Sequence, residues 1–241
     1  MKAMILAAGL GTRLKPWTDH HPKALALVNG KSLLERNIVY LQQFGIAEVL
    51  VNVHHFANQI IEAIEINKGW GSQVTISDET EQVLETGGGL KKAAGYFATE
   101  TDFVVMNADI LTKLDLGKMI DMHLQSKPLA TLAVSQRNTS RYFLFDKNGY
   151  LKGWRNVNTG EEKPADISAR IADLQQMAFS GIHVVNNGLF KLMHREGKFS
   201  MVDVYLDLCA THSIRSYDHT GELLVDVGKP ESILKAEKIF T

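Results

Sequence analysis

The sequence has little of several features that would narrow its class at once. It contains one cysteine and five prolines among 241 residues, and its formal net charge is −1. The single cysteine, Cys209, excludes an internal disulfide, and its apolar neighbours in VDVYLDLCATH predict an inert, buried thiol on a helix. The balanced charge gives no general attraction for nucleic acid or an anionic membrane, so any anionic ligand must be held by local groups.

Long hydrophobic runs are also missing. No apolar stretch approaches the ~20 residues that a membrane-spanning helix needs. The opening MKAMILAAG is too short for the apolar core of a secretory signal. We therefore expect a cytoplasmic protein without a membrane partner. With 45% hydrophobic and 22% charged residues, the chain has the composition of one globular domain with a substantial core.

The first half of the chain alternates between buried strands and amphipathic helices. Residues 2–8 and 47–53 are continuous apolar runs, typical of strands that are covered on both faces. Helices are predicted over 33–44, where Ser32 provides an N-cap, and over 57–66. Repeated βα units of this kind predict an α/β fold, with a Rossmann-like, mostly parallel sheet flanked by helices.

The pattern changes at about residue 128. The segments LATLAVS, YFLFD, YLKGW and FSGIHVV are short strand-like runs, and an Asn-Gly turn separates the second from the third. Hairpin spacing of this kind indicates a small antiparallel addition to the same sheet.

The loop AAGLGTRLKPWTDHHPKAL directly follows the first expected strand. Ligands of open α/β sheets bind at the carboxyl ends of the strands, where this loop begins. Gly9 and Gly11 allow backbone amides to approach an anion closely. Thr12 adds a hydroxyl donor, and Arg13 and Lys23 add positive charge suited to phosphate. The loop therefore predicts a phosphate-binding site.

Two well-known phosphate-binding loops do not fit this stretch. A Walker loop needs Gly-Lys-Ser/Thr after four intervening residues, and a dinucleotide fingerprint needs a third glycine that opens a helix. Pro16 and Pro22 oppose such a helix, which disfavours a Rossmann-type dehydrogenase. On the glycines alone, an ordinary surface loop remains an alternative.

With Arg13 and Lys23 included, the stretch resembles the signature of the sugar-1-phosphate nucleotidyltransferases, G-x-G-T-R-L-x-P-x-T followed by P-K. The resemblance implies the nucleotide-diphospho-sugar transferase fold in one domain over 1–241. The nucleotide would bind to about residues 1–127 and the sugar phosphate to about residues 128–241. In the loop, the implied nucleotide contacts are Ala7, Gly9, Gly11, Thr12, Arg13 and Lys23.

Two aspartates are candidate metal ligands. Asp109 in MNADI lies just past a buried strand, at the ligand edge of the sheet. Asp226 in ELLVDVGKPE interrupts an apolar strand, and buried aspartates are rare unless they are paired or bound to metal. Either one alone has a structural explanation, such as a turn. The resemblance implies that both hold Mg²⁺, and that Arg13, Lys23 and Asp109 are catalytic.

The three consecutive glycines of ETGGGL carry an entropic cost, so they should serve a close backbone approach. A mobile loop tip is the alternative. In the resembled family this loop lies against the base, and an acidic or amide side chain shortly before it reads the base edge. The implied base contacts are Glu79, Thr86, Gly87 and Gly88.

The sugar side is less clear from the sequence. The resemblance places Arg141, Ser180 and Gly181 at the sugar phosphate. A Glu-Lys-Pro motif of the family occurs at 162–164, but strand spacing instead aligns Trp154 and Arg155 with it, so both remain candidates.

The implied reaction is the in-line attack of a sugar 1-phosphate on the α-phosphorus of a nucleoside triphosphate, with release of pyrophosphate and with Mg²⁺ as cofactor. We expect UTP as the nucleotide. GTP with mannose or heptose 1-phosphate is the closest rival, and an inert nucleotide-sugar sensor is the alternative without turnover. The sequence does not decide between a monomer and a homo-oligomer.

Overall fold

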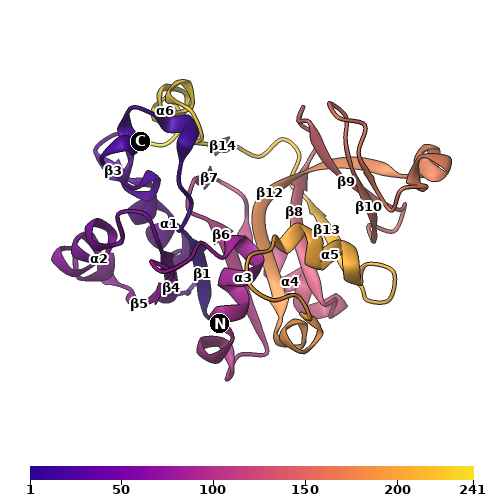
Figure 1. Cartoon of the computed structure of the whole chain (residues 1–241), viewed down its shortest axis with the longest axis horizontal. Coiled ribbons are helices and arrows are strands. Elements are labelled where there is room, and N and C mark those ends of the chain that lie inside the picture. Colours follow the sequence, from indigo (N-terminus) through magenta and orange to yellow (C-terminus); the bar gives the residue numbers. More distant parts are fainter.

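A ten-stranded sheet forms the centre of the protein (Figure 1). The computed structural model describes the backbone of residues 1–241 and the side chains outside 168–170. The strands of this sheet are β1 (Ala3–Leu6), β4 (Glu48–Val53), β5 (Gln73–Asp78), β6 (Asp102–Asn107), β8 (Ala130–Ser135), β9 (Arg141–Phe145), β10 (Leu151–Asn156), β11 (Glu162–Lys163), β12 (Gln175–Asn186) and β13 (Ile214–Asp218). They follow the order β11-β10-β9-β12-β6-β1-β4-β5, with β8 paired to β12 and β13 paired to β8.

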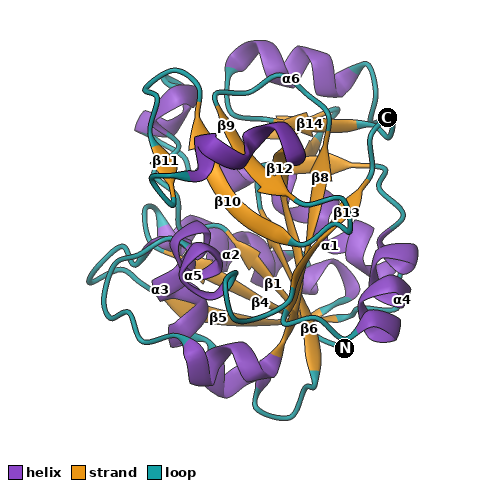
Figure 2. Ribbon diagram, turned by 90° about the vertical axis from the view of Figure 1, so that its right-hand side faces the viewer, coloured by secondary structure: helices purple, strands orange, loops and turns teal.

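The first half of the chain forms the parallel part of the sheet. β6, β1, β4 and β5 pair in parallel, with Ile5 opposite Val51 on one side and Met106 on the other. Helices cover both faces of this part (Figure 2). They are α1 (Leu33–Gln42), α2 (Ala57–Ile66) and α4 (Leu116–Ser126) on one face, and α3 (Glu85–Lys92) and α5 (Met201–Leu208) on the other. The predicted α/β fold class is confirmed.

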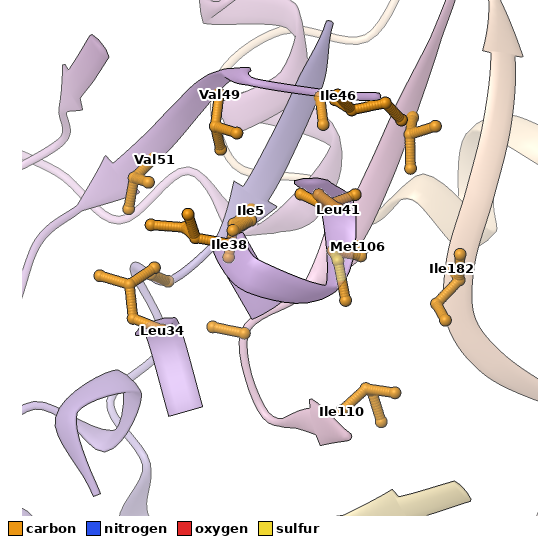
Figure 3. Packing of buried hydrophobic residues seen from close by; sticks show 14 of the residues in the cluster. Ile5, Leu34, Ile38, Leu41, Ile46, Val49, Val51, Met106, Ile110 and Ile182 are labelled. Carbon is orange, nitrogen blue, oxygen red and sulfur yellow. The ribbon is translucent and has the colours of Figure 1, made fainter. Parts of the chain in front are cut away.

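Helix α1 illustrates how local sequence produces this arrangement. The Ser32 hydroxyl accepts the backbone N–H of Glu35 at 3.0 Å, as the predicted N-cap requires. Leu34, Ile38 and Leu41 form one apolar stripe and point towards β1 and β4 (Figure 3). Burial of a leucine or isoleucine stabilises the fold by about 1.5–3 kcal/mol, so this stripe fixes the helix on the sheet.

The second half forms the antiparallel addition. β12 pairs antiparallel with three strands, β6, β8 and β9. β9, β10 and β11 continue antiparallel to the edge of the sheet, as the hairpin spacing predicted. β12 therefore joins the two halves of the protein, and its pairing with β8 is irregular between Phe179 and His183.

The C-terminal segment returns to the N-terminal half. β14 (Leu224–Asp226) pairs antiparallel with β7 (Ile110–Thr112), and α6 (Pro230–Glu237) contacts the hairpin strand β2 (Leu27–Val28), which pairs with β3 (Lys31–Ser32). These segments share a small separate hydrophobic core, which includes Leu14, Val28, Leu111 and Val225. In Figure 1 the yellow α6 consequently lies beside the indigo segment around β3.

The glycines of ETGGGL lie inside helix α3, so the expectation of a loop was wrong. The expected close backbone approach is present, but its partner is the chain around Phe199. The backbone N–H groups of Gly87 and Gly88 both donate to the Phe199 carbonyl, at 2.9 and 3.2 Å. A Cβ on Gly88 would lie 2.2 Å from the Gly197 carbonyl oxygen. Tertiary packing here overrides the low helix propensity of glycine.

The single cysteine is less buried than its apolar neighbours predicted. Cys209 lies at the C-terminal end of α5, where it is half-buried rather than fully buried, and burial raises the pKa of its thiol. In the part of the chain that the structure describes, no helix combines the length and apolarity needed to cross a membrane.

The packing of α3 predicts that Gly88→Ala destabilises the folded protein by about 1–3 kcal/mol, because backbone atoms must move to admit the methyl group. Gly95→Ala is the matched control, since a Cβ there meets nothing within 4 Å. Urea unfolding without nucleotide measures both. Equal unfolding midpoints for Gly88→Ala and the unmodified protein would show that this close contact does not exist.

Candidate active site

A cavity of about 500 Å³ opens beside the loop that follows β1. We call the loop over 7–25 the signature loop, and this cavity the cleft. The lining residues are Leu6, Ala7, Ala8, Gly9, Leu10, Gly11, Thr12, Lys23, Ala24, Asn52, Val83, Glu85, Thr86, Asn107, Ala108, Asp109, Lys198 and Ser200. The carboxyl ends of β1 and β6 meet here, so the cleft occupies the position where open α/β sheets bind ligands.

The signature loop is folded back on itself around Gly11. This residue has a φ of +62°, and a Cβ on it would lie 2.9 Å from both the Lys23 Cβ and the Thr18 Cγ2. The Thr18 hydroxyl donates to the Gly11 carbonyl at 3.0 Å. Glycine is therefore required here both for its backbone angle and for space. The fold of the loop brings Lys23 to the same cleft wall as Gly11.

A chain of buried hydrogen bonds supports the first residues of this loop. The backbone N–H of Ala7 donates to the Asn52 side chain at 2.7 Å, and Asn52 donates to the Glu79 carboxylate at 2.7 Å. Glu79 also accepts the backbone N–H of Leu84, and only 2% of it is exposed. Glu79 therefore lies behind the cleft wall and orients Asn52, whereas Thr86 lines the cleft itself.

Two carboxylates and two cations lie together beside the cleft, and two of these residues, Lys23 and Asp109, line it. Lys23 forms an ion pair with Asp109. The backbone N–H of Val227 donates to the Asp109 carbonyl at 2.8 Å, which holds the strand carrying Asp226 beside it. A Cβ on Gly228 would lie 2.8 Å from the Asp226 Oδ1 and 3.0 Å from the Arg13 Nη2. The predicted residues Arg13, Lys23, Asp109 and Asp226 are thus brought together from three distant segments.

The expectation that Asp226 is buried was wrong. It is exposed, because β14 has three residues and pairs with β7 alone in the described chain. Even so, its partial enclosure and then the negative charge of Asp109 raise the pKa of Asp226 above its ordinary value of 3.8. The positive charges of Lys23, Arg13 and Arg137 act in the opposite direction.

The paired aspartates are suited to a divalent cation. A cluster of three or more His, Cys, Asp or Glu side chains that could hold a metal is not found among the described residues. After partial enclosure, the negative charge of Asp109 is the second cause of the raised pKa of Asp226, and a divalent cation would relieve the repulsion between the two carboxylates. Mg²⁺ commonly uses one or two carboxylates and completes its ligands with phosphate oxygens and water. The two residues therefore fit Mg²⁺ bound together with a phosphorylated substrate.

The residues expected on the sugar side lie in different surroundings. Gly181 has a φ of +73°, and a Cβ on it would lie 2.7 Å from the Asn107 Nδ2, so it packs against the cleft wall. Ser180 is fully buried, with its hydroxyl 2.7 Å from the His219 Nε2. Arg141 is exposed at the start of β9 and does not line the cleft. Of these three, the structure brings only Gly181 to the cleft wall.

The two alternatives for the Glu-Lys-Pro position are neighbours in the structure. β10 and β11 pair so that Trp154 is opposite Lys163 and Arg155 is opposite Glu162. The Lys163 ammonium lies 3.1 Å from the carboxylate of Asp203 on α5. Both candidates thus belong to one hairpin, and Lys163 is already neutralised by an acidic partner.

Several cleft residues were missed by sequence reasoning. Asn107 precedes Asp109 by two positions, so the MNADI motif could have indicated it. Lys198 and Ser200 reach the cleft from the segment before α5, and the Lys198 ammonium lies 3.6 Å from the Glu85 carboxylate. No local motif marks this segment, since its place depends on the docking of Phe199 on α3.

A larger cavity of about 710 Å³ lies elsewhere, between α1, β7 and the last residues of the chain. It is lined by both acidic and basic side chains, including Glu35, Arg36 and Lys113. The smaller cavity is the candidate site, because it is the one lined by predicted site residues, namely Ala7, Gly9, Gly11, Thr12, Lys23, Thr86 and Asp109.

The raised pKa of Asp226 predicts that Asp226→Asn stabilises the ligand-free protein. When folding raises the pKa of an acid, the folded protein loses stability as the pH rises from the pKa of the unfolded state to that of the folded state. The asparagine side chain does not ionise, so the gain in the free energy of unfolding should be largest at neutral pH and vanish below about pH 4. Urea unfolding in a metal chelator at several pH values measures it, with Asp121→Asn on the exposed face of α4 as the control. A destabilising effect of Asp226→Asn at pH 7 would contradict this reading of the cleft.

Comparison with known proteins identifies the family of this chain. The sequence matches the nucleotidyl transferase family over residues 2–241. It is 40% identical to an N-acetylmuramate alpha-1-phosphate uridylyltransferase of Caulobacter vibrioides, over 98% of this chain and 95% of that protein. A D-glycero-alpha-D-manno-heptose 1-phosphate guanylyltransferase of Aneurinibacillus thermoaerophilus is 28% identical, over 99% of this chain and 97% of that protein.

The fold agrees as well. HddC from Yersinia pseudotuberculosis, solved in complex with GMP-PN, superimposes with a TM-score of 0.79 and 24% identity, covering 100% of this chain and 99% of that one. The resemblance noted at the signature loop is confirmed. Because the match extends over almost every residue, the chain belongs to the nucleotidyl transferase family.

Proposed function

We propose that the protein transfers the uridylyl group of UTP to N-acetylmuramate 1-phosphate, forming a uridine diphosphate sugar and pyrophosphate. The observation that carries the proposal is the convergence of Arg13, Lys23, Asp109 and Asp226 beside the cleft. An inert sensor would not need two aspartates held side by side. The choice of UTP and of the sugar rests on the uridylyltransferase relative, which is 40% identical over nearly its whole length.

The signature loop would hold the triphosphate. Gly9 and Gly11 line the cleft, and backbone N–H groups of this loop would supply the donors that a triphosphate needs for its several negative charges. Arg13 would stabilise the charge that develops on the leaving pyrophosphate. Lys23 would exchange part of its ion pair with Asp109 for contact with phosphate, close to the reacting phosphorus.

The reaction needs no nucleophile from the protein. A phosphate oxygen of the sugar 1-phosphate forms a bond to the α-phosphorus, and the bond from that phosphorus to the bridging oxygen of the β-phosphate breaks. The electron pair leaves with pyrophosphate. The protein contributes by positioning two anions in line and by stabilising the charge on the phosphorus oxygens.

Asp109 and Asp226 would hold the Mg²⁺ ion of this reaction. When bound, the ion supplies positive charge that offsets the repulsion between the two phosphorylated substrates. The low exposure of the Lys23 and Asp109 side chains, 13% and 24%, limits the access of water to this pair and so strengthens these electrostatic contacts.

A second candidate keeps the same reaction and changes the substrates. The heptose 1-phosphate guanylyltransferase relative also covers almost the whole chain. The cleft wall beside Thr86 carries Glu85 and Lys198, which can accept from and donate to a base edge. Uracil and guanine both present such donors and acceptors, so GTP is retained as the rival nucleotide.

A pyrophosphate-release assay tests the proposal. The four common ribonucleoside triphosphates are each combined with Mg²⁺ and with N-acetylmuramate, mannose or heptose 1-phosphate. UTP with N-acetylmuramate 1-phosphate is expected to give the highest kcat/KM. Preference for GTP would show that UTP is not the nucleotide, but the class of reaction would stand. If no combination releases pyrophosphate, the proposed reaction itself is wrong.

Asp226→Asn is expected to lower kcat by about a hundredfold or more, because it removes one metal ligand. The folded structure should persist, since this residue is exposed at an edge strand. Steady-state kinetics at saturating Mg²⁺ measures the effect, and Asp121→Asn provides the control for loss of one carboxylate. Undiminished turnover in Asp226→Asn would exclude its role as a metal ligand.

A further inference from the structure

Glu85 has a strained backbone conformation at the cleft. It is the first residue of α3, and its φ is +59°, in the left-handed region that favours glycine. Among the described residues, six residues other than glycine have a positive φ, and Glu85 is the one that lines the cleft. Strained backbone conformations are concentrated at functional sites. The conformation therefore points to a use for this carboxylate that glycine could not provide.

The partner of this carboxylate is Lys198, which also lines the cleft. The Lys198 ammonium lies 3.6 Å from the Glu85 carboxylate, and both side chains are about half exposed. This distance exceeds that of a hydrogen bond, and an ammonium has three donors, so Lys198 can bind a second anion while it stays beside Glu85. Lys163 differs, because it contacts the carboxylates of both Glu161 and Asp203.

The backbone next to Lys198 is fixed to α3. The Phe199 N–H donates to the Leu84 carbonyl at 3.1 Å, and the Phe199 carbonyl accepts the N–H groups of Gly87 and Gly88. The next element, α5, contacts both α3 and β10 (Figure 1). β10 belongs to the hairpin that carries both sequence candidates for the sugar side. Lys198 therefore lies on the wall of the cleft that continues towards this hairpin.

The proposed substrates carry one anionic group that the residues discussed so far do not bind. Among the described residues that line the cleft, Lys23 and Lys198 are the two with a positive charge. Lys23 is paired with Asp109 and belongs to the loop that would hold the triphosphate. N-acetylmuramate 1-phosphate carries a carboxylate on its lactyl ether in addition to its phosphate. A carboxylate that enters a cleft and loses water needs a cationic or hydrogen-bonding partner there.

We propose that Lys198 binds the carboxylate substituent of the sugar, and that it thereby selects an acidic sugar 1-phosphate over its neutral counterpart. Glu85 is a positioning residue that keeps the ammonium of Lys198 at the cleft. The inference rests on the proposed function, because it takes N-acetylmuramate 1-phosphate as the second substrate. It leaves the phosphate groups of both substrates to other residues.

Two sugar 1-phosphates test this role, because N-acetylglucosamine 1-phosphate differs from N-acetylmuramate 1-phosphate only in lacking the lactyl group. Lys198→Met removes the charge and keeps an apolar stem. The ratio of kcat/KM for the acidic to the neutral substrate is expected to fall by about tenfold, the effect of losing a charged hydrogen bond at a partly exposed site. Lys198→Arg keeps the charge and should retain most of the ratio. Lys191→Met, at an exposed position before the same segment, controls for loss of one positive charge.

Glu85→Gly separates a functional from a structural role of the strained residue. Glycine relieves the backbone conformation, so the urea unfolding midpoint should not decrease. The ratio of the two kcat/KM values should still fall, by about twofold to fivefold, because the ammonium loses its exposed partner. In the Lys198→Met background, Glu85→Gly should leave the ratio unchanged, since no ammonium remains to be positioned. The same fall in that background would show that Glu85 does not act through Lys198.

An unchanged ratio in Lys198→Met would overturn the assignment, and a rise in the KM for UTP alone would place Lys198 at the base instead. If the unmodified protein releases no pyrophosphate with N-acetylmuramate 1-phosphate, the proposed function fails for this sugar. Calorimetric titration of this compound then decides separately for Lys198. Weaker binding to Lys198→Met than to the unmodified protein supports the contact, whereas equal binding, or no binding to either, excludes it.

Discussion

The close approach of Asp109 and Asp226 is the constraint on which the rest of the site depends. Two carboxylates repel each other, and the ion pair with Lys23 and the nearby charge of Arg13 offset that repulsion. The surrounding fold also holds the pair in place. β14 pairs with β7, the Val227 N–H donates to the Asp109 carbonyl, and the Asn37 side chain donates to the Ala108 carbonyl at 2.8 Å. The C-terminal segment is therefore part of the active site although it is last in the chain.

Local patterns were sufficient to predict most of the fold. The apolar run over 2–8 and the helix over 57–66 follow from periodicity, and both occur nearly as predicted. The helix α3 could not be predicted from its own residues, because three glycines disfavour a helix. It forms because residues 197–199, more than a hundred positions later, occupy the space that side chains would need. Only the tertiary structure contains that information.

The same distinction applies to the site. The signature loop and the two aspartates are marked by contiguous motifs, so the sequence could indicate them. Glu79 has a suitable residue type and position in the sequence, but its hydrogen bond to Asn52 places it behind the cleft wall. Lys198 has no motif, and it reaches the cleft because Phe199 docks on α3. Residues whose role arises from long-range packing were the ones that sequence reasoning missed.

The central claim is that the cleft positions two phosphorylated substrates for a direct transfer without a covalent enzyme intermediate. The most direct test uses UTP made chiral at the α-phosphorus by a sulfur substituent, followed by determination of the configuration in the nucleotide sugar. A single in-line displacement inverts that configuration, so inversion is the predicted result. Retention would require two successive displacements and hence a nucleophile from the protein, which would contradict the account.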